Sequence, residues 1–199
     1  MARSLRILVI GAAFLAGLVL CLGAVLMLSG RLSAPVAQQV AAIGGGPFKL
    51  VDQNGQTLTD ADLKGHPFLV FFGFTHCPDV CPTTLFDVSE VLRSLGPDAD
   101  RTRALFITVD PERDTPPVMK DYLSSFDPHL SGLTGDPAAI AAVAKAYRVY
   151  YKKVPLDQGG YTMDHTAIVY LMDKDGRFVA PFSLKRTTEA AAADLRRYL

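Results

Sequence analysis

The hydrophobic positions of this 199-residue chain form two kinds of pattern. Residues 7–30 form one uncharged, mostly apolar run, which is longer than the roughly 20 residues that cross a bilayer. After residue 47, short apolar runs alternate with breaks that contain Gly, Pro or charged residues. The first pattern predicts one transmembrane helix, and the second predicts a globular domain.

The most hydrophobic run of the globular part, Phe-Leu-Val-Phe-Phe at residues 68–72, predicts a strand buried on both faces. Residues 103–109 predict a second buried strand, and residues 82–95 between them place apolar side chains at helical spacing. Further along, the pattern predicts these elements: helix 115–126, strand 129–133, helix 138–147, strand 147–154, loop 155–162, strand 164–172, its hairpin partner 177–181, and a helix from 188.

Before these elements, residues 48–52 and 56–59 flank an Asn-Gly pair, which is a strong signal for a β-hairpin. Alternation of strands and helices, ending in a hairpin and a helix, is typical of the thioredoxin arrangement. The sequence therefore predicts an α/β, thioredoxin-like fold with an additional N-terminal β-hairpin, preceded by one transmembrane helix.

The same patterns divide the chain into a membrane anchor at residues 1–31, a flexible tether at residues 32–47 and a domain at residues 48–199. A cleavable signal peptide is the alternative, but its apolar core usually has about 7–15 residues, so we expect the anchor to be retained. Arg3 and Arg6 precede the apolar run, which favours a cytoplasmic N-terminus with the domain on the other side.

The charge of the chain argues only against nucleic-acid binding. The chain has 20 basic and 20 acidic residues, and no part of it carries the basic surface typical of nucleic-acid binding. Among its three cysteines, Cys21 lies in the apolar run and is expected to be a packing residue, whereas Cys77 and Cys81 lie in the domain. The domain therefore has one cysteine pair with which to do chemistry.

Cys77 and Cys81 lie between the strand at 68–72 and a helix expected to start near Pro82, where the helix dipole favours thiolates. Three residues separate them, whereas thioredoxin-like redox loops have two. Such a pair can close a disulfide or bind a soft metal ion such as copper(I) or zinc. A purely structural disulfide is less favoured, since so short a loop gains little chain entropy.

Two thiolates leave a metal's coordination incomplete, so a third donor is expected elsewhere. His165 is the candidate, because it lies at the start of a strand that thioredoxin folds pack beside the cysteine loop. His76 is adjacent to Cys77 and could compete as the third donor, but neighbouring side chains point in different directions and rarely bind one ion together. His66 and His129 are expected to be surface residues.

Three segments, residues 73–82, 108–116 and 164–172, together resemble the Sco (SenC) family, and the resemblance extends over residues 45–199. Proteins of that family are membrane-anchored, thioredoxin-fold copper proteins that help to build the dinuclear copper centre of cytochrome c oxidase. The resemblance implies a metallochaperone rather than an enzyme.

Carried over residue by residue, the resemblance makes Cys77, Cys81 and His165 the ligands of one copper ion per domain, as copper(I), copper(II) or both. Met163 is not required by the family motif and is treated as a bystander. The implied partners are subunit II of cytochrome c oxidase and an upstream periplasmic copper donor.

The expected location is the bacterial inner membrane, with the domain in the periplasm, because no Arg/Ser-rich transit segment precedes the apolar run. The mitochondrial inner membrane, facing the intermembrane space, is the alternative.

A second function remains open, since the dithiol of Cys77 and Cys81 could instead reduce cysteines of the oxidase subunit. A peroxidase is disfavoured, because the chain lacks the Pro-x-x-x-Thr-x-x-Cys arrangement of peroxiredoxins. Asp110 and Arg113, after the strand at 103–109, are interpreted as capping a turn rather than as forming a docking face.

Overall fold

The computed structural model describes residues 15, 17–23, 25 and 44–199. The described residues up to 25 are helical and belong to a different unit from residues 41–199, so each unit is considered by itself. Among the described residues, no helix is both long enough and apolar enough to cross a membrane. Most of the predicted anchor and most of the predicted tether lie outside the described residues, and both stay predictions.

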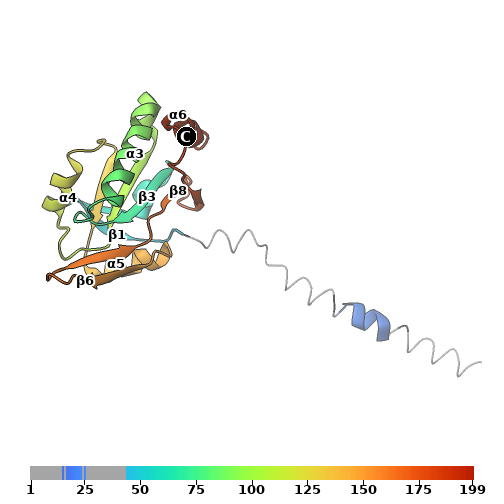
Figure 1. The fold of residues 1–199 in the computed structure, drawn as a ribbon. Coiled ribbons are helices and arrows are strands. Elements are labelled where there is room, and N and C mark those ends of the chain that lie inside the picture. Colours follow the sequence, from blue (N-terminus) through green and yellow to red (C-terminus); the bar gives the residue numbers. More distant parts are fainter. Residues whose placement is uncertain (1–14, 16, 24, 26–43) are drawn as a thin grey trace, which may run out of the picture. The chain divides into compact units, whose positions relative to one another are not determined.

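The domain is built on a seven-stranded sheet with the order β2-β1-β5-β4-β3-β8-β9 (Figure 1). β4 lies at its centre, and the adjacent β3 is parallel to β4 and antiparallel to β8. A separate two-stranded sheet pairs β6 with β7. The strands are β1 (Lys49–Asp52), β2 (Thr57–Thr59), β3 (Phe68–Gly73), β4 (Arg103–Thr108), β5 (Leu130–Thr134), β6 (Tyr151–Pro155), β7 (Tyr161–His165), β8 (Val169–Met172) and β9 (Phe178–Pro181).

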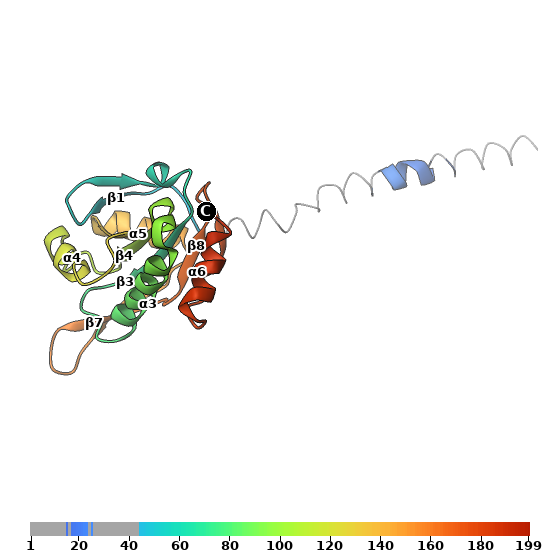
Figure 2. The same cartoon turned by 90° about the horizontal axis from the view of Figure 1, so that it is seen from above.

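Four α-helices and two short 3₁₀ helices complete the domain: α3 (Val80–Leu95), α4 (Pro116–Leu123), α5 (Pro137–Ala146), α6 (Thr188–Arg196), η1 (Asp60–Leu63) and η2 (Gly96–Arg101). α3 and α6 lie side by side on one face of the large sheet, and α5 covers the opposite face (Figures 1 and 2). The start of α5 shows why a helix forms there, because the Asp136 side chain accepts a hydrogen bond from the Ala139 amide at 2.8 Å.

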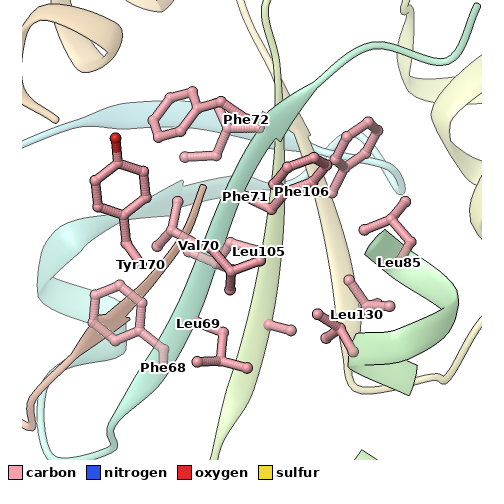
Figure 3. Close-up of a cluster of buried hydrophobic side chains, with 14 of the residues drawn as sticks. Phe68, Leu69, Val70, Phe71, Phe72, Leu85, Leu105, Phe106, Leu130 and Tyr170 are labelled. Carbon is pink, nitrogen blue, oxygen red and sulfur yellow. The ribbon is translucent and has the colours of Figure 1, made fainter. Parts of the chain in front are cut away.

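Because helices cover both faces of the sheet, every residue of β3 is buried. Its side chains alternate, so that Phe72 packs on one face with Tyr147 and Tyr170, at ring-centroid distances of 5.4 and 6.3 Å. Phe71 points to the other face, toward α3, and stacks on Phe106 at 6.1 Å (Figure 3). Because both faces of β3 are buried, residues 68–72 are all apolar instead of alternating between apolar and polar side chains.

The structure confirms the two buried strands, the N-terminal β-hairpin and the alternation of strands and helices. The expected helix at 115–126 ends at Leu123. The expected strand at 147–154 was placed too early: Arg148 has a φ of 53°, in the left-handed region, so extended structure begins only at Tyr151.

The prediction of one strand over 164–172 is wrong. The loop predicted over 155–162 is confirmed at residues 156–160 and is shorter than predicted at both ends. Residues 161–165 form β7 and residues 169–172 form β8, in different sheets. The end of β7 is held in the small sheet by Thr166, whose amide donates to the Tyr150 carbonyl at 2.9 Å. Its hydroxyl accepts from the Tyr150 amide at 3.1 Å. His165 therefore lies at the end of a hairpin, not at the start of a central strand.

Candidate metal centre

The cysteine loop follows β3 and leads directly into α3. The Cys77 amide donates to the Phe74 carbonyl at 3.2 Å, which closes a tight turn. The Cys81 amide then donates to the Cys77 sulfur at 3.4 Å. α3 begins at Val80, so Cys81 belongs to its first turn rather than to the loop before it. Cys81 is fully buried, and 9% of Cys77 remains exposed.

Gly73 provides the space that the Cys81 sulfur occupies. A Cβ at residue 73 would lie 2.7 Å from that sulfur and 2.7 Å from Cε2 of Phe106. Both contacts are shorter than atoms tolerate, and neither neighbour can move freely within the core. The last residue of β3 must therefore lack a side chain for Cys81 to occupy its position.

A buried carboxylate holds the first part of the loop. Asp114 accepts two hydrogen bonds from Thr75, one from its amide at 3.0 Å and one from its hydroxyl at 2.6 Å. It also accepts from the Thr108 hydroxyl at 2.6 Å. Because Thr108 ends β4, these bonds tie the cysteine loop to the neighbouring strand.

His165 brings its imidazole to the buried sulfur, with Nε2 3.5 Å from the Cys81 sulfur. The other ring nitrogen, Nδ1, lies 3.2 Å from the Thr166 carbonyl oxygen. A carbonyl only accepts, so Nδ1 is the donor and Nε2 of the neutral ring carries the lone pair that faces the sulfur. This tautomer is the one that a metal ligand bound through Nε2 requires.

Aromatic rings fix the orientation of the imidazole. The Phe71 ring meets His165 edge-on with centroids 6.1 Å apart, and the Phe74 ring does so at 5.8 Å. These rings come from β3 and from the residue that follows it. The imidazole is therefore packed against the same segment that supplies the cysteines.

The structure brings together all three predicted site residues. The sulfurs of Cys77 and Cys81 and a ring nitrogen of His165 lie within 4.8 Å of one another, and both cysteines are free thiols. Two sulfurs and one imidazole suit a soft or borderline metal ion. A pocket of about 300 Å³ opens onto this group and is lined by Phe74, Cys77, Pro78, Asp79, Val80, Thr162, Met163, Asp164 and His165. Cys77 thus lies at the opening and Cys81 beneath it.

The expectation that the helix N-terminus would favour the thiolate does not hold for Cys81. Burial raises the pKa of its thiol far above the ordinary value, and the nearby Cys77 and Asp114 add smaller contributions in the same direction. The Phe74 backbone opposes the rise without cancelling it. In this structure Cys81 holds its proton, and a metal ion must displace that proton to bind.

Other candidate residues lie outside the cluster. His66 is exposed, and so is His76, whose ring lies 3.1 Å from the Thr75 hydroxyl. His129 is half-buried rather than a free surface residue, because its two ring nitrogens contact Asp127 and Asp100.

Met163 was treated as a bystander, yet it is buried and lines the pocket. The alternation of side chains along β7 places it on the same face as His165, and this signal follows from the strand once its bounds are known. Asp114, by contrast, has no sequence signal that would have predicted its contact with the cysteine loop, 39 residues earlier.

The fold and the site together define a thioredoxin-like protein with a candidate metal centre of two sulfurs and one imidazole. The family model described as SCO1/SenC matches residues 36–199. The chain belongs to this family.

Relatives of known structure share the fold. The copper-bound ScoI of Bradyrhizobium japonicum is 70% identical, with a TM-score of 0.77 over 78% of this chain and 99% of that one. The copper-bound Sco1 of yeast is 36% identical, with a TM-score of 0.69 over 78% of this chain and 90% of that one. These likenesses show the thioredoxin-like Sco fold.

Curated relatives include mitochondrial proteins. The bovine mitochondrial SCO2 homologue is 43% identical over 82% of this chain and 62% of its own length. The human mitochondrial SCO1 homologue is 46% identical over 75% of this chain and 51% of its own length. The aligned part thus spans less than two thirds of each of these relatives.

Proposed function

We propose that this chain binds one copper ion through Cys77, Cys81 and His165 and serves in the assembly of cytochrome c oxidase. The observation that carries the proposal is the His165 Nε2 lone pair facing the Cys81 sulfur at 3.5 Å, within a group of three donors. Membership of the SCO1/SenC family and the copper-bound relatives from Bradyrhizobium japonicum and yeast support copper as the metal. The resemblance to the Sco family supplies the oxidase as the destination.

The site favours copper because its donors are soft. Two thiolates and an imidazole give three-coordinate copper(I), and one further ligand would accommodate copper(II). Both thiols lose their protons on binding, so affinity rises with pH until both are ionised. Cys77 lies at the pocket opening, so ligands of an incoming protein reach the metal from its side while Cys81 and His165 still hold it.

The proposed destination is the dinuclear copper centre in subunit II of the oxidase, and an upstream copper donor loads the site. In this proposal residues 1–31 anchor the chain in the bacterial inner membrane and the domain works in the periplasm. The apolar run at residues 7–30 and the two arginines before it support that topology.

A thiol–disulfide reductase is the second candidate, favoured by the hydrogen bond from the Cys81 amide to the Cys77 sulfur. In this reaction the thiolate form of Cys77, which lies at the pocket opening, attacks a client disulfide and releases one client thiol. Cys81 then loses its proton, attacks the mixed disulfide and releases the second. The client gains two thiols, the chain keeps a Cys77–Cys81 disulfide, and an external dithiol must reduce it again.

Metal analysis of the purified full chain tests the copper proposal. We expect one copper per chain under reducing conditions, and loss of that copper from Cys77→Ala and Cys81→Ala. Cys21→Ala is the matched control and keeps it, because Cys21 lies in the apolar run of the predicted anchor and not in the domain. Undiminished copper binding by Cys77→Ala would contradict the assignment.

The variant His165→Ala separates the two functions. Thiol–disulfide exchange needs only the two sulfurs, whereas a three-donor copper site needs the imidazole. We expect His165→Ala to keep reversible oxidation of Cys77 and Cys81, to lose copper(II) binding and to retain copper(I) less tightly. The measurements are a thiol-state assay and oxidase assembly in complemented cells at limiting copper, where full assembly would favour the reductase.

A further inference from the structure

The hairpin that carries His165 is not part of the large sheet. β6 and β7 pair only with each other in the described part of the chain, whereas the cysteines follow β3 of the seven-stranded sheet. No backbone ladder therefore fixes the distance from the imidazole to the sulfurs. Side-chain contacts between the hairpin and the rest of the domain must set it.

Arg113 makes such contacts. It lies in the turn after β4, and its Nη1 donates to the Tyr161 carbonyl, the first residue of β7, at 3.0 Å. The guanidinium carbon lies 3.9 Å from the centre of the Tyr161 ring, within the range of a cation–π interaction. Arg113 thus contacts both the main chain and the side chain of Tyr161.

Asp110, in the same turn, contacts both Arg113 and Tyr161. It is buried and forms an ion pair with Nε of Arg113, and its other carboxylate oxygen accepts from the Tyr161 hydroxyl at 2.9 Å. Arg113 and Asp110, which both contact Tyr161, are therefore also paired with each other. The interpretation of Asp110 and Arg113 as a plain turn cap is too narrow, because both reach across to the hairpin.

Arg113 also reaches the imidazole through an aromatic ring. Its guanidinium lies 5.9 Å from the centre of the Phe74 ring, whose edge-on contact with His165 was described above. Along β7, alternation places Tyr161 on the same face as His165. Arg113 therefore contacts Tyr161 at the start of β7. It also contacts the Phe74 ring, against which His165 at the end of β7 packs.

The same turn holds the cysteine side of the site, since Asp114 binds Thr75. The residues from Asp110 to Asp114 thus contact both halves of the metal centre. Nη2 of Arg113 is buried with no hydrogen-bond partner in the described structure. Burying an unpaired N–H group costs free energy. The contacts of the guanidinium with Asp110 and with the Tyr161 carbonyl and ring must offset that cost.

We propose that Arg113 is a positioning residue of the metal site: it locks the β6–β7 hairpin so that His165 Nε2 stays against Cys81. The proposal rests on the function proposed above and deepens it. Removing the guanidinium frees the hairpin and swings the imidazole away from the sulfurs. The two thiols, which sit on α3 and its preceding loop, keep their places.

The test uses Arg113→Met in the full chain, because methionine keeps an unbranched apolar side chain and removes the guanidinium. In the metal-free protein we expect amide hydrogen exchange at residues 161–166 to rise about tenfold or more, with no change in β3. Copper(II) affinity, measured by competition with a chelator, falls about 10- to 100-fold, as for other outer-shell partners of metal ligands. The midpoint potential of the Cys77–Cys81 couple stays the same.

Lys153→Met is the matched control. Lys153 also contacts the Tyr161 ring, at 4.2 Å, and pairs with Glu112 at 2.8 Å. Both partners of that ion pair are largely exposed, so it contributes little. We expect wild-type copper affinity and wild-type hairpin exchange. A loss equal to that of Arg113→Met, with Arg113 still present, would show that the effect is not specific to Arg113 and would overturn the assignment.

A double variant shows whether Arg113 acts through the imidazole. In a His165→Ala background, Arg113→Met should cause no further loss of copper(I) affinity, because the group that it positions is gone. An equal loss in both backgrounds would overturn the proposal. If Arg113→Met does not fold, Tyr161→Leu removes the ring contact with Arg113 and the hydroxyl bond to Asp110 but leaves the main-chain hydrogen bond, so it must give a smaller change in the same direction.

The exchange measurement needs no metal, so it separates the two proposals. Faster hairpin exchange in a protein that binds no copper would leave the positioning role standing and refute the copper function. Normal exchange in Arg113→Met, with copper bound by the wild-type chain, would refute the positioning role alone.

Discussion

Gly73 is the residue on which the position of the buried sulfur depends. The space that a Cβ would fill is taken by Cys81 on one side and by Phe106 on the other. A glycine inside a fully buried strand weakens that strand, so its presence is explained by this close approach.

We therefore predict that Gly73→Ala reduces the free energy of copper binding by more than it reduces the free energy of unfolding. The added methyl group must displace the Cys81 sulfur from its contact with His165, because the Phe106 ring is fixed by stacking on Phe71. An affinity titration beside a urea denaturation curve checks this. Wild-type affinity in a folded variant would show that the site tolerates the shift.

His129 allows a prediction about pH. Hydrogen bonds to Asp100 and then to Asp127 raise the pKa of its imidazole above the ordinary value of about 6.5. A raised pKa means that the folded state binds the proton more tightly, so this stabilisation is complete below about pH 6.5 and is lost as pH rises through the folded pKa.

His129→Gln should therefore lower the free energy of unfolding more at about pH 5.5 than at about pH 8.5. Denaturant titrations of wild type and variant at both pH values give the two differences. Equal differences would mean that the protonated ring contributes nothing through the two carboxylates.

Among the elements, the turn from Asp110 to Asp114 connects parts that the sheet leaves separate. Asp114 accepts three hydrogen bonds while fully buried, two from Thr75 and one from Thr108. Removing it leaves three donors without an acceptor.

We predict that Asp114→Ala lowers the free energy of unfolding by about 3 kcal/mol or more, since each unsatisfied buried donor costs about 1–3 kcal/mol. Thr75→Val, which removes only the hydroxyl contact, should cost less. Urea denaturation measures both. A similar small loss in the two variants would contradict this account of the loop.

How far the sequence predicts these elements depends on the range of the contacts that make them. The buried run of β3 and the spacing of Cys77 and Cys81 are local patterns, and both lead to the correct architecture. The break after His165 is not local, because residues on both sides suit a strand. It arises from pairing with β6 on one side and with β3 on the other.

The supporting contacts of the site could not be predicted for the same reason. Arg113 and the Tyr161 carbonyl are 48 residues apart, and no periodicity relates them. The position of His165 beside the two cysteines could be predicted, because a third donor was expected and the chain has only four histidines. The residues that hold it carry no such chemical restriction.

For the whole molecule, the prediction concerns residues 1–31. If they form the anchor, a chain that begins after residue 31 should move from the membrane fraction to the soluble fraction and keep its copper stoichiometry. Cell fractionation followed by metal analysis checks both. A full-length chain found in the soluble fraction would contradict the anchor.

The point where the domain meets its N-terminal extension is far from the metal centre. Gly46 and Pro47 line a pocket with Phe68, the first residue of β3, whereas Gly73 at the other end of that strand contacts Cys81. The two ends are roughly 17 Å apart at about 3.3 Å per residue. A rotation of the domain by about 30° around Gly46 would move the Cys81 end of β3 by roughly 9 Å, given that strand length. If the chain carries copper as proposed above, such a rotation would turn the copper site from a donor toward an acceptor without any change inside the fold.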